Sequence, residues 1–207
     1  MKTLLQLNTS LFSDGGQSSR LAARFVADWR ARNPRSTVIA RDLAADPVPH
    51  LTAERFQSFL APAAERTPVQ QSIVDYSDAL IDELRRAGVI VIGLPMYNFG
   101  VPSTLKAYFD HIARANVTFR YTENGPQGLL TGKKAYVFAT RGGRYAGTQD
   151  DSETAFVRQF LGFLGIDDVE FVYAEGLAIG DAAKAAALAG AERTIERLVA
   201  PAERLAA

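Results

Sequence analysis

The chain has no cysteine among its 207 residues and only two histidines, His50 and His111. The missing cysteine excludes disulfide bonds, thiolate nucleophiles and thiolate–metal sites. A zinc site would have to consist mostly of carboxylates, so we predict no metal site. The lack of cysteine is also typical of a reducing compartment, and we predict a cytoplasmic protein. We expect His50 at the surface and His111 in a structural or partner-facing position.

The chain also lacks an excess of either charge and lacks a long hydrophobic run. Its 23 basic and 23 acidic side chains cancel, whereas nucleic-acid-binding surfaces usually carry a basic excess. The apolar N-terminal run, residues 3–8, is too short for a signal peptide, and no later run is long enough to span a membrane. We therefore predict a protein that binds neither nucleic acid nor a membrane.

Several nucleotide-binding and catalytic motifs are missing. No G-x-G-x-x-G follows the first apolar run, and there is no G-x-S-x-G of the kind that an α/β-hydrolase esterase carries. The segment QGLLTGKK, residues 127–134, is only loosely similar to a Walker loop, because its glycines are one residue too close and no Ser or Thr follows the lysine. The function has to come from another arrangement.

Apolar runs alternate with segments of helical periodicity along the whole chain. We predict strands over 3–8, 36–43, 89–94, 134–143 and 168–176, helices over 18–33, 70–88, 102–115, 152–166 and 181–205, a short helix near 52–60, and a hairpin-like insertion within 117–134. Near-continuous apolar strands indicate a parallel sheet buried on both faces. We therefore predict one α/β domain over 1–207, a flavodoxin-like, doubly wound, five-stranded parallel sheet with helices on both faces.

Ligands of doubly wound sheets bind at the carboxyl ends of the strands, so the loops after the first, third and fourth predicted strands are the candidates. The first, NTSLFSDGGQSSR, is rich in hydroxyls and glycine and opens a helix. Free N–H groups at a helix N-terminus suit a phosphate, and without a basic residue between Lys2 and Arg20 they suit a single phosphomonoester. An equally weighted alternative is that the serines simply cap the helix.

The second loop, PMYNFGVPS, begins at Pro95. Met96, Tyr97 and Phe99 offer apolar surface to a flat isoalloxazine ring, and Asn98 offers polar contacts. Its prolines stiffen the backbone, because each fixes its own φ and restricts its predecessor. The alternative is a strand-to-helix connection whose aromatic side chains tuck into the core.

The third loop, TRGG, ends the fourth predicted strand. Gly142 and Gly143 let the backbone approach the edge of a planar ligand, and Arg141 either serves an electron-rich carbonyl or faces solvent. Three loops that each suit a different part of one molecule indicate flavin mononucleotide (FMN).

Longer segments add a family resemblance that covers essentially the whole chain and is weakest in 44–68 and in the tail. The segments are PMYNF, VTFRYTENGPQGLLTGKKA, RGG, FLGFLGI and FVYAEG. Through them the chain resembles the bacterial FMN-dependent NADH azoreductases, also described as NADH:quinone oxidoreductases.

The resemblance implies a homodimer with one tightly bound FMN per subunit and active sites at the interface. It assigns to the cofactor Ser10, Gly16, Gln17, Ser18, Met96, Tyr97, Asn98, Phe99, Thr140, Arg141, Gly142 and Gly143, and it places Phe119, Tyr121 and Phe163 around the substrate space. The family pattern has serine at position 16 and often serine at position 140, so Gly16 has only its backbone N–H to offer.

The activity implied is ping-pong hydride transfer from NADH, through FMN, to quinones or aromatic azo compounds. Quinones would leave as hydroquinones and azo compounds as amines, and the flavin carries the chemistry without a catalytic side chain. One alternative is a flavodoxin-type FMN electron carrier that serves protein partners, although such carriers tend to be strongly acidic. Another is a binding module of the same fold that takes no flavin.

Overall fold

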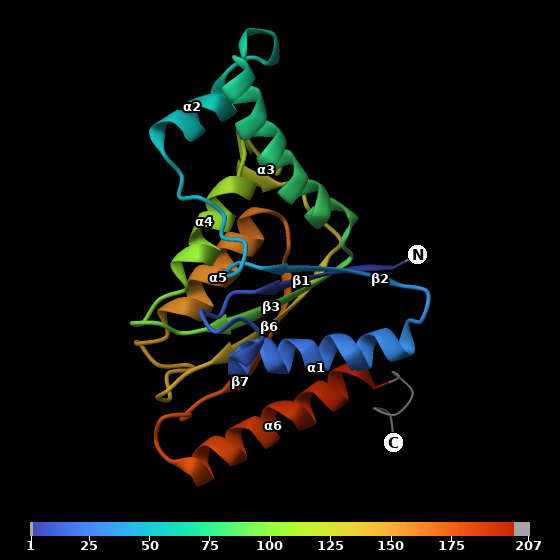
Figure 1. The fold of residues 1–207 in the computed structure, drawn as a ribbon, viewed down its shortest axis with the longest axis vertical. Helices are drawn as coiled ribbons and strands as arrows, with labels where there is room; N and C mark the ends of the chain where they lie inside the picture. The colour runs from blue at the N-terminus through green and yellow to red at the C-terminus, as the bar shows by residue number, and fades with distance from the viewer. Residues whose placement is uncertain (1, 201–207) are drawn as a thin grey trace.

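The computed structural model of the protein describes residues 2–200 and is built around one parallel sheet (Figure 1). Its five strands are β1 (Thr3–Asn8), β2 (Thr37–Asp42), β3 (Val89–Pro95), β6 (Lys134–Thr140) and β7 (Asp168–Ala174), in the spatial order β2-β1-β3-β6-β7. The order reverses between β1 and β3, so the crevice expected to bind ligands lies between them. The predicted doubly wound, flavodoxin-like fold is confirmed.

Helices cover both faces of the sheet, as Figure 1 shows. One face packs on α1 (Gln17–Arg32) and α6 (Asp181–Val199), and the other on α3 (Pro68–Arg86), α4 (Ser103–Ile112) and α5 (Ser152–Phe163). The apolar stripe of α1, with Leu21, Phe25 and Trp29 one turn apart, is buried against the sheet. This burial explains why the strands are apolar on both sides.

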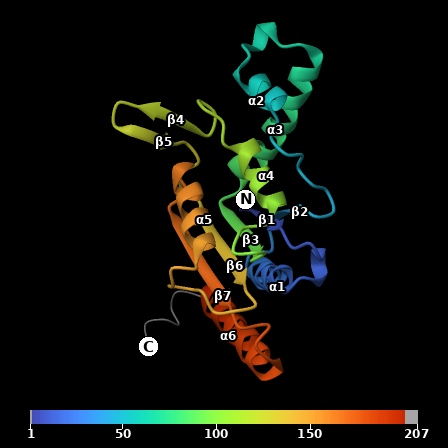
Figure 2. The ribbon, with the colours of Figure 1, turned by 90° about the vertical axis from the view of Figure 1, so that its left-hand side faces the viewer.

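Two peripheral elements extend beyond this core. The short helix α2 (Ala53–Leu60) lies against α3 (Figure 1), with a 3-10 turn, η2 (Ala63–Glu65), between them. The predicted insertion is the antiparallel hairpin β4 (Phe119–Thr122) and β5 (Gly125–Gly128), which projects from the body in Figure 2.

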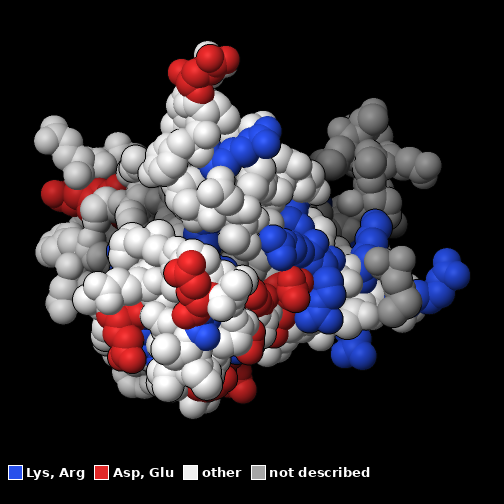
Figure 3. All heavy atoms as spheres, turned by 90° about the horizontal axis from the view of Figure 1, so that it is seen from above, with Lys and Arg blue, Asp and Glu red and all other residues white. Residues whose placement is uncertain are grey.

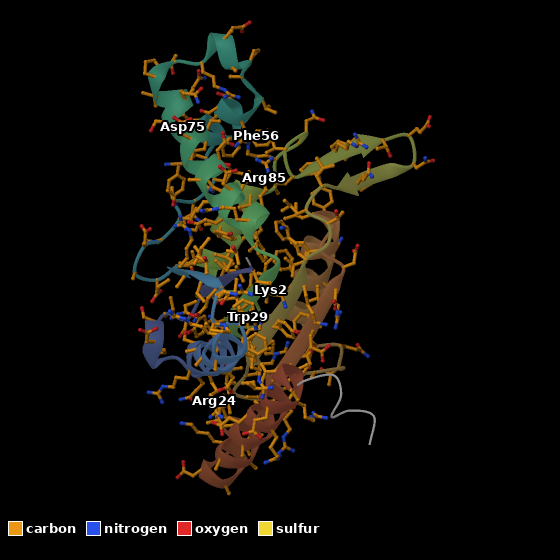
Figure 4. The ribbon with its side chains drawn as sticks, turned by 90° about the vertical axis from the view of Figure 1, so that its right-hand side faces the viewer. Lys2, Arg24, Trp29, Phe56, Asp75 and Arg85 are labelled. Carbon is orange, nitrogen blue, oxygen red and sulfur yellow. The ribbon has the colours of Figure 1, made fainter. Side chains whose placement is uncertain are left out.

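The hairpin emerges at the amino ends of the strands. Arg85, at the last turn of α3, donates from Nη2 to the Val117 carbonyl at 3.1 Å, and Lys133 Nζ donates to the carbonyls of Arg85 and Ala87. Figure 4 views the molecule from this side, with Arg85 labelled at the end of α3. The hairpin is therefore fixed at the amino ends of the strands, and the candidate ligand loops lie at the opposite, carboxyl ends.

Most of the predicted elements end earlier in the structure than the sequence pattern indicated, and three of them show the physical reason. β6 ends at Thr140 because the glycines after it form a turn, and α5 ends at Phe163 because Gly165 has a left-handed φ of 92°, which is typical of the residue after a helix. The last helix ends at Val199, since Ala200 is extended. The predicted continuation over 201–205 lies outside the described residues.

The surface carries both signs of charge. Seen from above, Lys and Arg side chains lie among Asp and Glu side chains, with broad uncharged areas between them (Figure 3). Within residues 2–200, no helix is both apolar enough and long enough to cross a bilayer.

Candidate functional site

The three predicted loops meet at the carboxyl edge of the sheet, the side that faces the viewer in Figure 2. They lie close together because their strands are neighbours in register, Asn8 beside Gly93 and Pro95 beside Thr140. Hydrogen bonds then join the loops. Leu11 N donates to the Tyr97 hydroxyl at 3.2 Å, and Met96 N donates to the Thr140 carbonyl at 3.0 Å.

The first loop brings a helix N-terminus to this edge. The N-cap of α1 is Gly16, which has no side chain to accept from the first-turn N–H groups. The hydroxyls of Ser18 and Ser19 are buried, and neither has a hydrogen-bond partner among the described residues. Ser10 is also buried; its Oγ accepts from Phe12 N at 3.2 Å and lies 3.4 Å from the Tyr97 hydroxyl. Neutral donors and a helix dipole without a partner suit a phosphate.

Two glycines make this arrangement possible. A Cβ at Gly16 would lie 2.2 Å from Ser10 Oγ, so any side chain at this position would require Ser10 to move. A Cβ at Gly93 would lie 3.1 Å from the Ser18 backbone, so the start of α1 sits directly on β3. Gly16 therefore contributes space and backbone, as expected from its lack of a hydroxyl. Gln17 is the first residue of the helix and is half-buried.

The second loop is a strained turn. Tyr97 and Gly100 exchange two backbone hydrogen bonds of 3.1 Å, and between them Asn98 and Phe99 both have positive φ, 51° and 62°. Two consecutive non-glycine residues in this region cost free energy, which is a recurring feature of ligand sites. The alternative of core packing is wrong for Phe99, whose side chain is 58% exposed. Met96 and Tyr97 are half-buried beside it.

The third loop continues the same surface. Gly142 is exposed, and a Cβ at Gly143 would lie 2.6 Å from the ring of Tyr145, so the loop folds that ring back over its own glycine. Tyr145 also meets Phe99 edge to face, with centroids 5.5 Å apart. No local sequence pattern singles out Tyr145, because packing between different loops places it here.

Both expectations for the Arg141 side chain are corrected by the structure. The guanidinium is fully buried, neither beside the ring surface nor in solvent. It donates to Asp151 at 2.6 Å and to Glu175 at 3.1 Å, and it lies over the ring of Tyr173. Its backbone N–H and C=O are occupied by Ala174 and Leu177. Arg141 therefore anchors the glycine loop from beneath.

A second buried carboxyl group completes this cluster. Glu153 Oε2 lies 3.4 Å from Arg141 Nε, but neither oxygen of Glu153 makes a hydrogen bond within the described chain. Burial raises the pKa of Glu153 to about 8, against the opposing effect of Arg141. Burial also acts to raise the pKa of Asp151, but hydrogen bonds from Arg141 and Thr154 outweigh it and leave that pKa below its usual value. With its pKa raised to about 8, Glu153 is mostly protonated at neutral pH.

The three aromatic residues expected around the substrate lie away from the candidate ligand loops of their own chain. Phe119 packs on Phe163 with centroids 4.3 Å apart and on Tyr121 at 5.5 Å, and Tyr121 is 74% exposed. They lie at the amino end of the sheet, because α5 runs back along it from the candidate loops. A strand of seven residues, the length of β6, spans roughly 20 Å. A single chain therefore does not bring these side chains to its own ligand loops.

Neither histidine lies in the three candidate loops. His50 is exposed, as expected. His111 is fully buried, and its Nδ1 lies 2.9 Å from the Ala107 carbonyl within α4. Burial lowers its pKa. His111 is therefore a structural residue, one of the two positions that the sequence left open.

Comparison with known proteins gives the same fold and specific relatives. A family described as having a flavodoxin-like fold matches residues 1–199. The FMN-dependent NADH:quinone oxidoreductase of Cellvibrio japonicus is 52% identical over 200 residues, 97% of this chain and 100% of that protein. FMN-dependent NADH:quinone oxidoreductase 6 of Burkholderia lata is 55% identical over 195 residues, 94% of this chain and 98% of that protein.

Solved structures agree. The FMN-dependent NADH-azoreductase from Bacillus anthracis str. Ames Ancestor, in complex with FMN, superposes with a TM-score of 0.85 at 27% identity, covering 97% of this chain and 100% of that one. An azoreductase from Bacillus anthracis str. Sterne gives a TM-score of 0.88 over 96% and 99% of the two chains, and at 23% identity it supports the fold.

Proposed function

The chain belongs to the family with the flavodoxin-like fold, and from that membership we propose that it is an FMN-dependent NADH:quinone oxidoreductase that also cleaves aromatic azo compounds. The observation that carries this proposal is the pair of buried hydroxyls at the open N-terminus of α1, Ser18 and Ser19, for which residues 2–200 supply no hydrogen-bond partner. A phosphate at this terminus would accept from the Ser18 hydroxyl and from the free N–H groups of the first turn, in the field of the helix dipole.

The residues present fit an FMN from one end to the other. Ser10, Gly16, Gln17 and Ser18 would hold the phosphate by hydroxyls and N–H groups. Met96, Tyr97, Asn98 and Phe99 would meet the ring and ribityl chain from one loop, and Thr140, Gly142 and Gly143 from the other. Arg141 supports that second loop from below. When bound, FMN supplies hydride acceptance from NADH and hydride donation to the second substrate.

The side chains of the chain act by binding and orientation. The strained turn at Asn98 and Phe99 presents an amide and an aromatic face at a fixed angle, held by the Ser152 hydroxyl, which donates to the Phe99 carbonyl. The edge-to-face pair of Phe99 and Tyr145 excludes water and favours flat apolar acceptors. Both substrates use one surface in turn, which is the structural basis for ping-pong kinetics.

The proposal includes a homodimer with active sites at the interface. Phe119, Tyr121 and Phe163 lie far from the ligand loops of their own chain, and Tyr121 is exposed on a projecting hairpin. In a dimer this hairpin would reach the loops of the second subunit and line the acceptor space there. The whole chain then works as a single FMN-binding domain of a cytoplasmic enzyme.

Steady-state kinetics tests this function. With FMN-loaded protein, we expect NADH oxidation that depends on an added quinone, parallel double-reciprocal plots, and loss of colour from an aromatic azo dye at two NADH per azo bond. An electron carrier would instead require a separate reductase before it turned over. NADPH, run beside NADH on the same acceptors, measures the preference for the donor. Absence of acceptor-dependent NADH oxidation with every quinone and dye would contradict the proposal.

A further inference from the structure

Three carboxyl groups share one guanidinium beneath the candidate cofactor loops. Asp151, Glu153 and Glu175 surround Arg141 at 2.6, 3.4 and 3.1 Å, and their side chains are 6%, 0% and 16% exposed. Only Glu153 lacks a hydrogen bond, and Arg141 Nε, the nitrogen that faces it, is unpartnered too within the described residues. One guanidinium cannot neutralise three ionised carboxyl groups. The cluster is therefore sensitive to the charge of Glu153, the carboxyl group without a hydrogen bond.

The cluster is the common anchor of two cofactor loops. Glu175 Oε1 accepts from the backbone N–H groups of Tyr145 and Ala146, both at 2.9 Å, as well as from Arg141. Asp151 caps α5 by accepting from Thr154 N, and the next residue, Ser152, donates to the Phe99 carbonyl. A shift of the Arg141 guanidinium would therefore be felt both in the glycine loop and in the turn at Phe99.

We propose that Glu153 is a positioning residue of the cofactor site, which acts through Arg141 on the two loops that Asp151 and Glu175 hold. The inference rests on the proposed binding of FMN at these loops. An uncharged Glu153 leaves the guanidinium to Asp151 and Glu175. An ionised Glu153 competes for it from the Nε side and adds a buried negative charge, which loosens both loops.

The surroundings of Glu153 support this role. Asp151 adds a like charge, and among residues 2–200 Arg141 is the one cation in contact with Glu153. Arg141 Nη2 also donates to the Thr154 hydroxyl, and the guanidinium lies over the ring of Tyr173, whose hydroxyl is 3.0 Å from Thr154 Oγ1. On the other side, a cavity of about 480 Å³ between the starts of α4 and α5 is bordered by Glu153 together with His50 and Lys106. The Lys106 ammonium is engaged by Asp110, so it does not neutralise Glu153.

The test is a titration of apoprotein with FMN, followed by flavin fluorescence, at several pH values from 6.5 to 9.5. The first variant, Glu153→Gln, keeps the shape of the side chain and removes its charge. The second, Glu153→Leu, removes the charge as well and serves if the Glu153→Gln protein folds poorly. Glu192→Gln, an exposed carboxyl on α6, is the matched control. For wild type and control we expect the Kd for FMN to rise about fivefold or more as the pH passes 8, a coupling of ordinary size between two sites.

The Gln and Leu variants should bind FMN as wild type does at pH 6.5 and should lose the rise at alkaline pH. Identical pH curves for wild type and both variants would overturn the role of Glu153 while leaving the proposed function intact. A weaker affinity of Glu153→Gln at pH 6.5 would also overturn it, because it would mean that the charged form supports the loops. Failure of wild type to bind FMN at any pH would overturn the proposed function itself.

Discussion

The Ser18 hydroxyl is buried, and the chain itself gives it no hydrogen-bond partner within residues 2–200. A buried hydroxyl without a partner costs about 1–3 kcal/mol, so in the absence of ligand this residue destabilises the folded chain. Ser77, also fully buried, has no such cost, because its hydroxyl donates to the His111 carbonyl at 2.6 Å. The two serines are equally buried and differ in whether the protein itself satisfies them.

Replacement of Ser18 therefore separates binding from stability. We expect Ser18→Ala to weaken FMN binding about 10-fold or more, the loss of a hydrogen bond to a charged group, while apoprotein stability is unchanged or raised. Ser77→Ala should behave in the opposite way, with normal FMN affinity and a loss of about 1 kcal/mol. Fluorescence titration and urea unfolding measure the two quantities. Equal FMN affinity of wild type and Ser18→Ala would contradict the phosphate assignment.

Gly16 provides a steric test of the same site. Its φ of −69° suits any residue, so Gly16→Ala acts only through the Cβ that would lie 2.2 Å from Ser10 Oγ. Ser10 then has to move, and we expect a loss of about 1–3 kcal/mol of stability together with weaker FMN binding. Gly15→Ala is the control, because its Cβ would meet nothing closer than 3.7 Å. Calorimetry measures the stability of both variants. An equal loss of stability in Gly16→Ala and Gly15→Ala would contradict this account of Gly16.

Glu153 predicts how apoprotein stability changes with pH. Its pKa is raised from 4.5 to about 8 on folding, so between these values the folded chain keeps a proton that the unfolded chain has released. The contribution of Glu153 to the free energy of unfolding is therefore fully present below pH 4.5 and is lost as the pH rises to 8. At about 1.4 kcal/mol per pKa unit, wild type should lose about 2–4 kcal/mol more than Glu153→Gln between pH 5 and 8. Urea unfolding at each pH measures the difference, and parallel curves would contradict it.

At the scale of elements, the order of strands and helices could be predicted from the sequence because it rests on periodicity. The loops at the strand ends could be predicted too, since topology alone brings 9–16, 96–102 and 141–151 to one edge. The direction of a side chain within a loop could not. In the sequence, Arg141 looks like any exposed residue that follows a strand. Its side chain turns inward because it pairs with the carboxylates at the start of α5 and just after β7.

The hairpin β4–β5 carries a prediction about the acceptor. If it serves the second subunit, Tyr121→Ala should raise the KM for quinones several-fold and leave the FMN content unchanged, because Tyr121 is exposed and remote from the loops of its own chain. Arg120→Ala, on the neighbouring and opposite-facing position of β4, is the control. Steady-state kinetics and flavin absorbance give the two readouts. Loss of FMN from Tyr121→Ala, or an unchanged KM, would speak against this placement.

At the scale of the whole molecule, the fold and the neutral surface both favour an enzyme that acts on small molecules over an electron carrier. An electron carrier for protein partners benefits from a strong field of one sign, which steers association. This chain carries equal numbers of acidic and basic side chains, intermixed on the face in Figure 3. A neutral surface suits small uncharged acceptors, for which the shape of the pocket decides binding.

The most direct measurement is an anaerobic titration of the purified protein, loaded with FMN, with NADH and without any partner reductase. The account predicts one FMN bound per chain and bleaching of the visible flavin absorbance by one NADH per FMN, with colour restored on addition of a quinone. A protein that stays colourless after incubation with FMN, or a bound flavin that NADH does not bleach, would contradict it.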